Sequence, residues 1–127
     1  MISRTTIPSS IQYNSGRYPI YDERQIFNVI TICGSMRFAS QMREHCIRLT
    51  MLGYVVLMPV EYEHLTPKQE KQVRKSHLEK IDLSDAIFVV NVDGYVGNDT
   101  AREIEYASKK GKKVFFINDE GEENELE

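Results

Sequence analysis

The chain has 127 residues, of which 41% are hydrophobic and 28% charged, and its formal net charge is -3. This length suits one domain with a hydrophobic core and is too short for two. Acidic and basic residues are mixed along the chain, so the sequence does not predict the basic surface of a nucleic-acid-binding protein. The first residues lack the apolar core of a signal peptide, and no apolar run reaches the roughly 18 residues that cross a membrane. We therefore expect a soluble, cytoplasmic protein that binds neither membranes nor nucleic acid polymers.

The two ends of the chain differ in composition from its middle. Residues 1–25 mix polar residues with prolines, a glycine and tyrosines, without helical or strand periodicity. We expect an N-terminal arm there whose tyrosines pack on the domain or on a second copy, and we expect the protein to be a homo-oligomer to which this arm contributes. Residues 119–127 are acidic and nearly free of apolar side chains, a composition typical of a flexible tail. Residues 26–118 remain as the folded domain.

Short apolar runs alternate with amphipathic stretches in this domain. The runs are rich in β-branched and aromatic residues, as parallel strands buried on both faces require, and they cover 27–33, 54–59, 86–92 and 113–118. Helical spacing of apolar residues predicts helices over 36–53, 66–85 and 100–111. The alternation predicts an α/β fold with a parallel sheet of four to five strands flanked by helices.

Ligands of such sheets bind in the crevice beyond the carboxyl ends of the strands, at a topological switch point. Two loops should meet there, "GSMR" (34–37) after the first strand and "DGYVGND" (93–99) after the third. In the first loop, backbone N–H groups of Gly34 and Ser35 and the guanidinium of Arg37 are suited to an anion. The alternative is a tight turn that Ser35 caps, with Arg37 in solvent.

Glu103 also has two interpretations, as a helix cap and as a catalytic residue. Thr100 and Glu103 fit the reciprocal capping box, T-x-x-E, at the start of the third helix. However, a carboxylate near a helix N-terminus also stays ionised, which suits a nucleophile. The preceding segment holds permissive glycines and polar groups that fit a sugar or a base: Asn91, Asp93, Gly94, Tyr95, Gly97 and Asp99.

Three segments together carry a resemblance to a known family: "ICGSMR" (32–37), "LSDAIFVVN" (83–91) and "GYVGNDTAREIEYASKKGKKVFF" (94–116). In their order and spacing they resemble the nucleoside 2-deoxyribosyltransferase superfamily, which includes the 2'-deoxynucleoside 5'-phosphate N-hydrolases. The resemblance implies a flavodoxin-like or Rossmann-like sheet. It also implies cleavage or transfer of an N-glycosidic bond, without metal or cofactor, in a nucleoside or nucleoside 5'-monophosphate.

The same resemblance assigns roles to individual residues. Glu103 matches the glutamate that attacks the anomeric carbon, and residues 34–37 match the loop that holds a 5'-phosphate. Asp85 matches an aspartate that opens the third strand. Asp93 or Asn91 lies where polar groups contact the sugar, and Asp93 is our second candidate catalytic residue. Thr100 belongs to the matching pattern and is a candidate substrate contact.

The chain departs from the family at Asp99 and Glu105, where glycines are usual. A non-catalytic nucleotide-binding or sensing module is therefore the alternative to an enzyme. Cys33 and Cys46 form no C-x-x-C pair, and no histidine stands at metal-ligand spacing from them. We expect both to be reduced, with Cys33 as a core residue, and we expect no metal site. His77 lies in a charged helix and is expected at the surface or half-buried.

Overall fold

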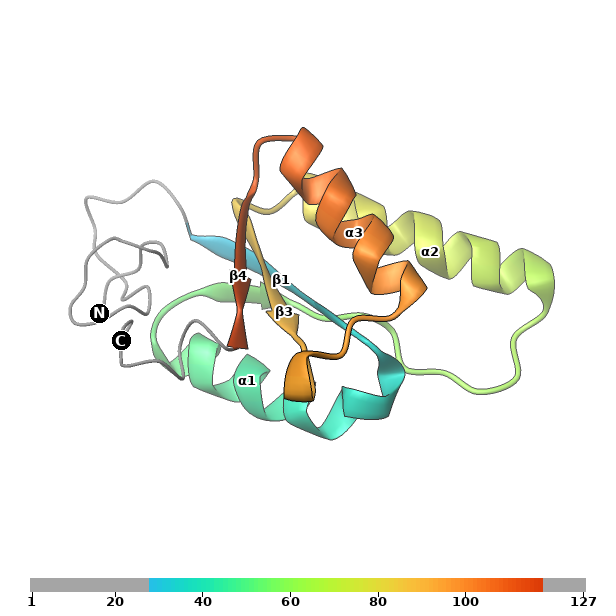
Figure 1. Cartoon of the computed structure of the whole chain (residues 1–127), viewed down its shortest axis with the longest axis horizontal. Coiled ribbons are helices and arrows are strands. Elements are labelled where there is room, and N and C mark those ends of the chain that lie inside the picture. Colours follow the sequence, from blue (N-terminus) through green and yellow to red (C-terminus); the bar gives the residue numbers. More distant parts are fainter. Residues whose placement is uncertain (1–27, 118–127) are drawn as a thin grey trace.

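The computed structural model describes residues 28–117, and the predicted arm and tail lie outside them. A parallel sheet forms the centre of the fold, with helices on both faces (Figure 1). Its strands are β1 (Val29–Gly34), β2 (Val55–Leu57), β3 (Ala86–Val90) and β4 (Lys113–Phe116), in the order β2-β1-β3-β4. The helices are α1 (Ala39–Met51), α2 (Pro67–Asp82) and α3 (Asn98–Lys109). The α/β fold predicted from the sequence is confirmed.

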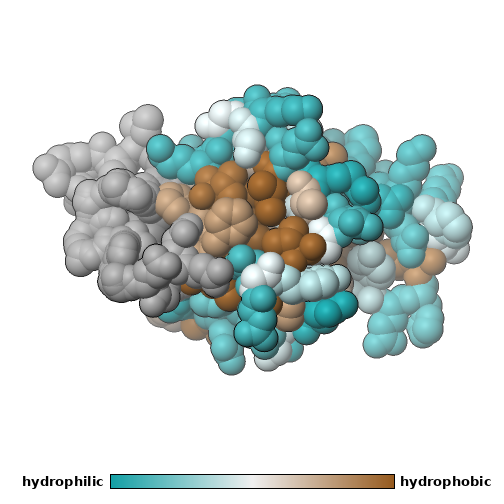
Figure 2. All heavy atoms as spheres, viewed as in Figure 1, coloured by the Kyte–Doolittle hydropathy of each residue, from teal (hydrophilic) through white to brown (hydrophobic). Residues whose placement is uncertain are grey.

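The central strands β1 and β3 pair in parallel from Ile30 opposite Ala86 to Gly34 opposite Val90. Every residue of β3 is buried, whereas the edge strands β2 and β4 are only partly buried. The prediction of strands buried on both faces is therefore right for the centre and wrong for the edges, because an edge strand has a neighbouring strand on one side only. Figure 2 shows hydrophobic side chains gathered around the β4 edge between α1 and α3.

The pleat divides the core into two clusters. Ile30, Ile32 and Phe88 face α1 and pack with Met42 and Leu49 of that helix. On the opposite face, residues such as Cys33 and Val89 pack with Ile81 of α2 and Ala107 of α3. Figure 1 shows α1 on one side of the sheet and α2 and α3 on the other, as right-handed crossovers in this strand order require. Among the described residues, no helix is long and apolar enough to cross a membrane.

Local signals explain where the helices begin and end. Thr66 caps α2 in a complete capping box: its hydroxyl accepts from the Gln69 backbone N–H, and the Gln69 side chain accepts from the Thr66 N–H. Pro67 follows at the first helical position, where its missing N–H costs nothing. After α1, Gly53 has φ of 107°, a left-handed conformation that glycine adopts easily. These local signals explain the predicted end of the first helix at Gly53 and the predicted start of the second helix at Thr66.

Asp85 joins the amino ends of the central strands. Its carboxylate accepts the backbone N–H groups of Asn28 at 2.8 Å and Val29 at 2.9 Å, and its own N–H donates to the Val29 carbonyl at 2.8 Å. This end of the sheet is opposite the carboxyl ends where ligands bind in such folds. The position that resembles the family's strand-opening aspartate is therefore a structural one here.

We predict that Asp85→Ala lowers the free energy of unfolding by about 1.5–3 kcal/mol, because the two N–H groups lose a charged acceptor. Urea denaturation of the full chain measures this loss. Glu79→Ala is the matched control, since it removes an exposed carboxylate whose ion pair, with Lys75, lies on the same helix. That control should change stability by no more than about 0.5 kcal/mol. Equal losses in the two variants would contradict the role of Asp85.

Candidate functional site

A cavity of about 500 Å³ lies beyond the carboxyl end of β1. Its walls come from the loop after β1, the segment after β2, the middle of α2 and the first turns of α3. The two loops predicted to meet do meet there. Six of the residues predicted for the site line this cavity: Gly34, Ser35, Gly97, Asp99, Thr100 and Glu103.

Glu103 lies in this wall and does not cap α3. The helix begins at Asn98 with Gly97 as its N-cap, and no side chain makes a capping hydrogen bond. Thr100 is instead buried within the first turn. The capping-box interpretation of Thr100 and Glu103 is therefore wrong, because the helix starts one turn before that pattern. The Glu103 side chain is only 18% exposed and is directed toward α2.

The partner of Glu103 is a buried histidine. Nε2 of His77 lies 3.5 Å from Oε1 of Glu103 and 3.5 Å from Sγ of Cys33. These residues come from α3, α2 and β1, and His77 itself is 6% exposed. Cys33 is a core residue, as predicted, but a histidine that the sequence spacing did not indicate lies beside it. The expectation that His77 is at the surface or half-buried is wrong, because the residue is buried. We call these three residues the Cys33–His77–Glu103 triad.

The triad combines three kinds of chemically active group. Burial, and then the nearby Glu103 carboxylate, raise the pKa of the Cys33 thiol well above its ordinary value. Cys33 is thus a neutral thiol rather than a nucleophile. The donor atoms of the three residues all lie within 4.8 Å of one another, so the triad is also the group of described residues that could hold a metal ion. Nδ1 of His77 is buried and has no hydrogen-bond partner among the described residues.

The glycine and serine of the first loop have local explanations. A Cβ at Gly34 would lie 3.0 Å from the Val90 carbonyl oxygen and 3.1 Å from the Met42 sulfur, so the close approach of β1 to β3 favours glycine. Ser35 accepts from the Arg37 backbone N–H at 3.3 Å and caps a short 3₁₀ turn, Met36–Phe38. The predicted Ser35 cap is present, and the residue also lines the cavity.

Arg37 and Tyr95 interact with each other and do not line the cavity. The Arg37 guanidinium lies 4.1 Å from the centre of the Tyr95 ring, and Nη2 donates to the Tyr95 hydroxyl at 3.4 Å. Tyr95 also packs edge-on against Phe38. The guanidinium is exposed, so its role in binding a phosphate stays a prediction.

Other residues predicted for the site lie at positions 91–94, which include the turn Val92–Gly94 after β3. Asp93 and Gly94 are exposed and have φ of 55° and 80°. Asn91 is buried, and its Oδ1 has no hydrogen-bond partner among the described residues. These three do not line the cavity beside Glu103. The structure therefore separates Asp93 from the other candidate catalytic residue, and the sugar contacts proposed for Asn91, Asp93 and Gly94 stay predictions.

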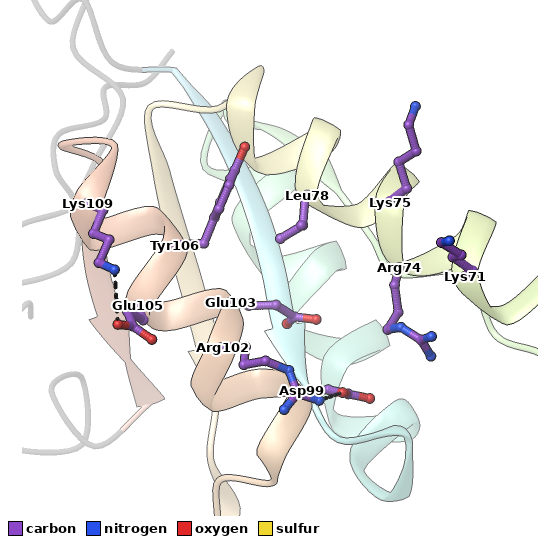
Figure 3. A pocket seen from close by; sticks show the side chains of 10 residues that line it. All are labelled: Lys71, Arg74, Lys75, Leu78, Asp99, Arg102, Glu103, Glu105, Tyr106 and Lys109. Carbon is purple, nitrogen blue, oxygen red and sulfur yellow. Dashed lines mark hydrogen bonds and ion pairs between the residues drawn. The ribbon is translucent and has the colours of Figure 1, made fainter.

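A second cavity, of about 550 Å³, lies between α2 and α3 and shares Arg74, Asp99, Arg102 and Glu103 with the first (Figure 3). Its cations are mostly neutralised by local partners. Lys75 pairs with Glu79, Arg102 with Asp99, and Lys109 with Glu105.

Arg74 differs from these cations. It has no ion-pair partner within residues 28–117, and it lines both cavities. It also lies three residues before His77, on the same side of α2. Sequence reasoning missed Arg74. Its position three residues before His77 could have pointed to it, but the sequence does not show that His77 lies near Glu103.

No protein-family model matches the chain, and no curated protein sequence matches it either. Inference about function therefore rests on the side chains of the cavity. Three features matter: a largely buried carboxylate, a buried histidine beside it, and, at the junction of two cavities, an arginine without an ion-pair partner among the described residues.

We predict that Cys33 resists alkylation by iodoacetamide in the folded protein, because it is fully buried and its raised pKa keeps the thiol protonated. Cys46, which is partly exposed on α1, should react first. The sequence has only these two cysteines, so peptide mass spectrometry distinguishes them. In urea the two should react at similar rates. Equal rates in the folded protein would contradict the burial of Cys33.

Proposed function

We propose that the protein cleaves or transfers the N-glycosidic bond of a nucleoside or nucleotide, with Glu103 as the nucleophile. The observation that supports this most is the position of Glu103. Its carboxylate is largely buried in a cavity at the carboxyl edge of the sheet, and no capping bond occupies it. A carboxylate needed only for helix stability would turn back to the helix start.

In the proposed reaction, a Glu103 oxygen attacks C1' of the sugar. The bond from C1' to the base nitrogen breaks, its electron pair leaves with the base, and a glycosyl ester forms on Glu103. Water or a second base then attacks C1' and releases the carboxylate. The nearby His77 would hold the carboxylate in its attacking orientation. Asp99, which lines the cavity, would position the sugar or handle a proton, whereas Asp93, the other candidate for this role, does not line it.

A 5'-phosphate on the substrate would need a cation. Arg37 is the residue that the family resemblance suggests, but its guanidinium lies on Tyr95. Arg74 lines the cavity beside Glu103 and lacks a partner among the described residues. Figure 3 shows Arg74 extending from α2 toward the start of α3. We therefore propose Arg74 as the first phosphate contact, with Arg37 as the comparison.

A nucleotide-binding module without catalysis is the second candidate. It is favoured by the ion pair between Asp99 and Arg102, which occupies a polar group at the cavity that a reacting sugar would need.

Our proposal further includes a cytoplasmic location and a homo-oligomer in which a neighbouring copy completes the site. Turnover separates the two candidate functions, since both predict nucleotide binding.

We predict that Glu103→Gln lowers the rate of base release by orders of magnitude while nucleotide binding persists, because a neutral amide cannot attack C1'. Stability should change by less than about 1 kcal/mol, since no capping bond is lost. Chromatography of free base released from nucleosides and 5'-monophosphates, with EDTA present, measures the reaction. Glu105→Gln, on the same helix but exposed and paired with Lys109, is the matched control and should keep activity. Undiminished turnover in folded Glu103→Gln would contradict the assignment of Glu103 as the nucleophile.

We predict that Arg74→Ala weakens binding of a nucleoside 5'-monophosphate by about 1.5–3 kcal/mol, the range for hydrogen bonds to charged groups. Binding of the unphosphorylated nucleoside should stay nearly unchanged. Calorimetric titration of both ligands against Arg74→Ala and Arg37→Ala compares the two cations. A selective loss only in Arg37→Ala would move phosphate recognition to the first loop. Equal losses for both ligands in Arg74→Ala would remove Arg74 from phosphate binding.

A further inference from the structure

The Cys33–His77–Glu103 triad offers one sulfur, one nitrogen and one oxygen donor at a single point. Two of these residues are buried and the third is mostly so. Sulfur and imidazole nitrogen are ligands of Zn²⁺, whereas Mg²⁺ and Ca²⁺ take oxygen ligands. A mixed donor set of this kind is therefore selective for a soft divalent cation.

Two of the three distances within the triad agree with tetrahedral zinc, and the third, from Sγ of Cys33 to the Glu103 carboxylate, is within 4.8 Å. Around Zn²⁺, with Zn–S of about 2.3 Å and Zn–N of about 2.0–2.1 Å, the sulfur and nitrogen lie about 3.6 Å apart. A nitrogen and a carboxylate oxygen lie about 3.4 Å apart in the same geometry. In the protein, Nε2 of His77 is 3.5 Å from Sγ of Cys33 and 3.5 Å from Oε1 of Glu103. The triad can thus close around the ion with small side-chain movements.

We propose that Cys33, His77 and Glu103 bind Zn²⁺, and that the bound ion blocks the nucleophile. The cavity beside Glu103 gives the ion its entry path and leaves the fourth coordination position to water. On binding, the thiol proton passes to solvent and three bonds form, to thiolate, imidazole and carboxylate. No electron is transferred. The thiolate and the carboxylate neutralise the ion, so the loaded site carries no net charge.

The blocking effect follows from the shared carboxylate and rests on the proposed function. An oxygen of Glu103 that is bound to zinc cannot attack C1', so loaded protein should release no base. The proposed reaction itself needs no metal, and EDTA should restore it. Zinc binding and base release are therefore two independent measurements on the same residue.

Cobalt titration of the metal-free full chain tests the site. Tetrahedral Co²⁺ bound to a thiolate gives a charge-transfer band in the near ultraviolet and intense visible bands. The sequence has only two cysteines, so Cys33→Ser and Cys46→Ser identify the thiolate. We expect one equivalent of Co²⁺, displaced by Zn²⁺, with the band lost in Cys33→Ser and kept in Cys46→Ser. Glu103→Gln, which keeps the size of the side chain and removes the charged ligand, should weaken binding at least about 10-fold even if Cys33→Ser fails to fold.

Three results would overturn the site: no cobalt band at equimolar metal, a band that survives in folded Cys33→Ser, or Glu103→Gln binding as tightly as the native chain. Base release in EDTA without any cobalt band would reject zinc and leave the proposed reaction in place. A cobalt band without base release in EDTA would keep the zinc site and reject the reaction. With both present, Zn²⁺ should inhibit base release stoichiometrically, and uninhibited turnover by loaded protein would refute the block.

Discussion

The pairing of β1 with β3 is the constraint on which the rest of the molecule depends. Both strands are buried, and they approach so closely at their carboxyl ends that residue 34 has no room for a side chain without displacing the Val90 carbonyl or Met42. The chain leaves both strands at this edge. The loop after β1 therefore lies beside the start of α3, and the cavity forms between them.

A second set of contacts fixes α2 against this pair. The Thr31 hydroxyl of β1 donates to the Lys80 carbonyl at 3.1 Å and lies 2.6 Å from the Ser84 hydroxyl. Nζ of Lys80 donates to the Met58 carbonyl after β2 at 2.6 Å. His77 stands one turn before Lys80, so these bonds hold its imidazole next to Cys33. Rigid support of this kind is what a reactive carboxylate or a metal site requires of its neighbours.

The fold could be predicted from the sequence because its signals are local. A buried strand needs a continuous apolar run, and a covering helix needs apolar residues at helical spacing. Both patterns are visible within a few residues of the chain, and so are the Thr66 start of α2 and the glycine after α1. The same locality misled the interpretation of Thr100 and Glu103. Their spacing fits a capping box, but the helix had already started at Asn98.

The sequence by itself determined the layers of the fold and the two loops that meet at one edge of the sheet, and it pointed to Glu103 as a candidate. Only the tertiary structure decided what surrounds that carboxylate. Cys33 and His77 are 44 positions apart, and no local pattern connects them. They meet because α2 crosses the face of β1 from which the Cys33 side chain projects, and strand order and crossover hand set that meeting. Arg74 lines the cavity for the same reason, since α2 is packed beside it.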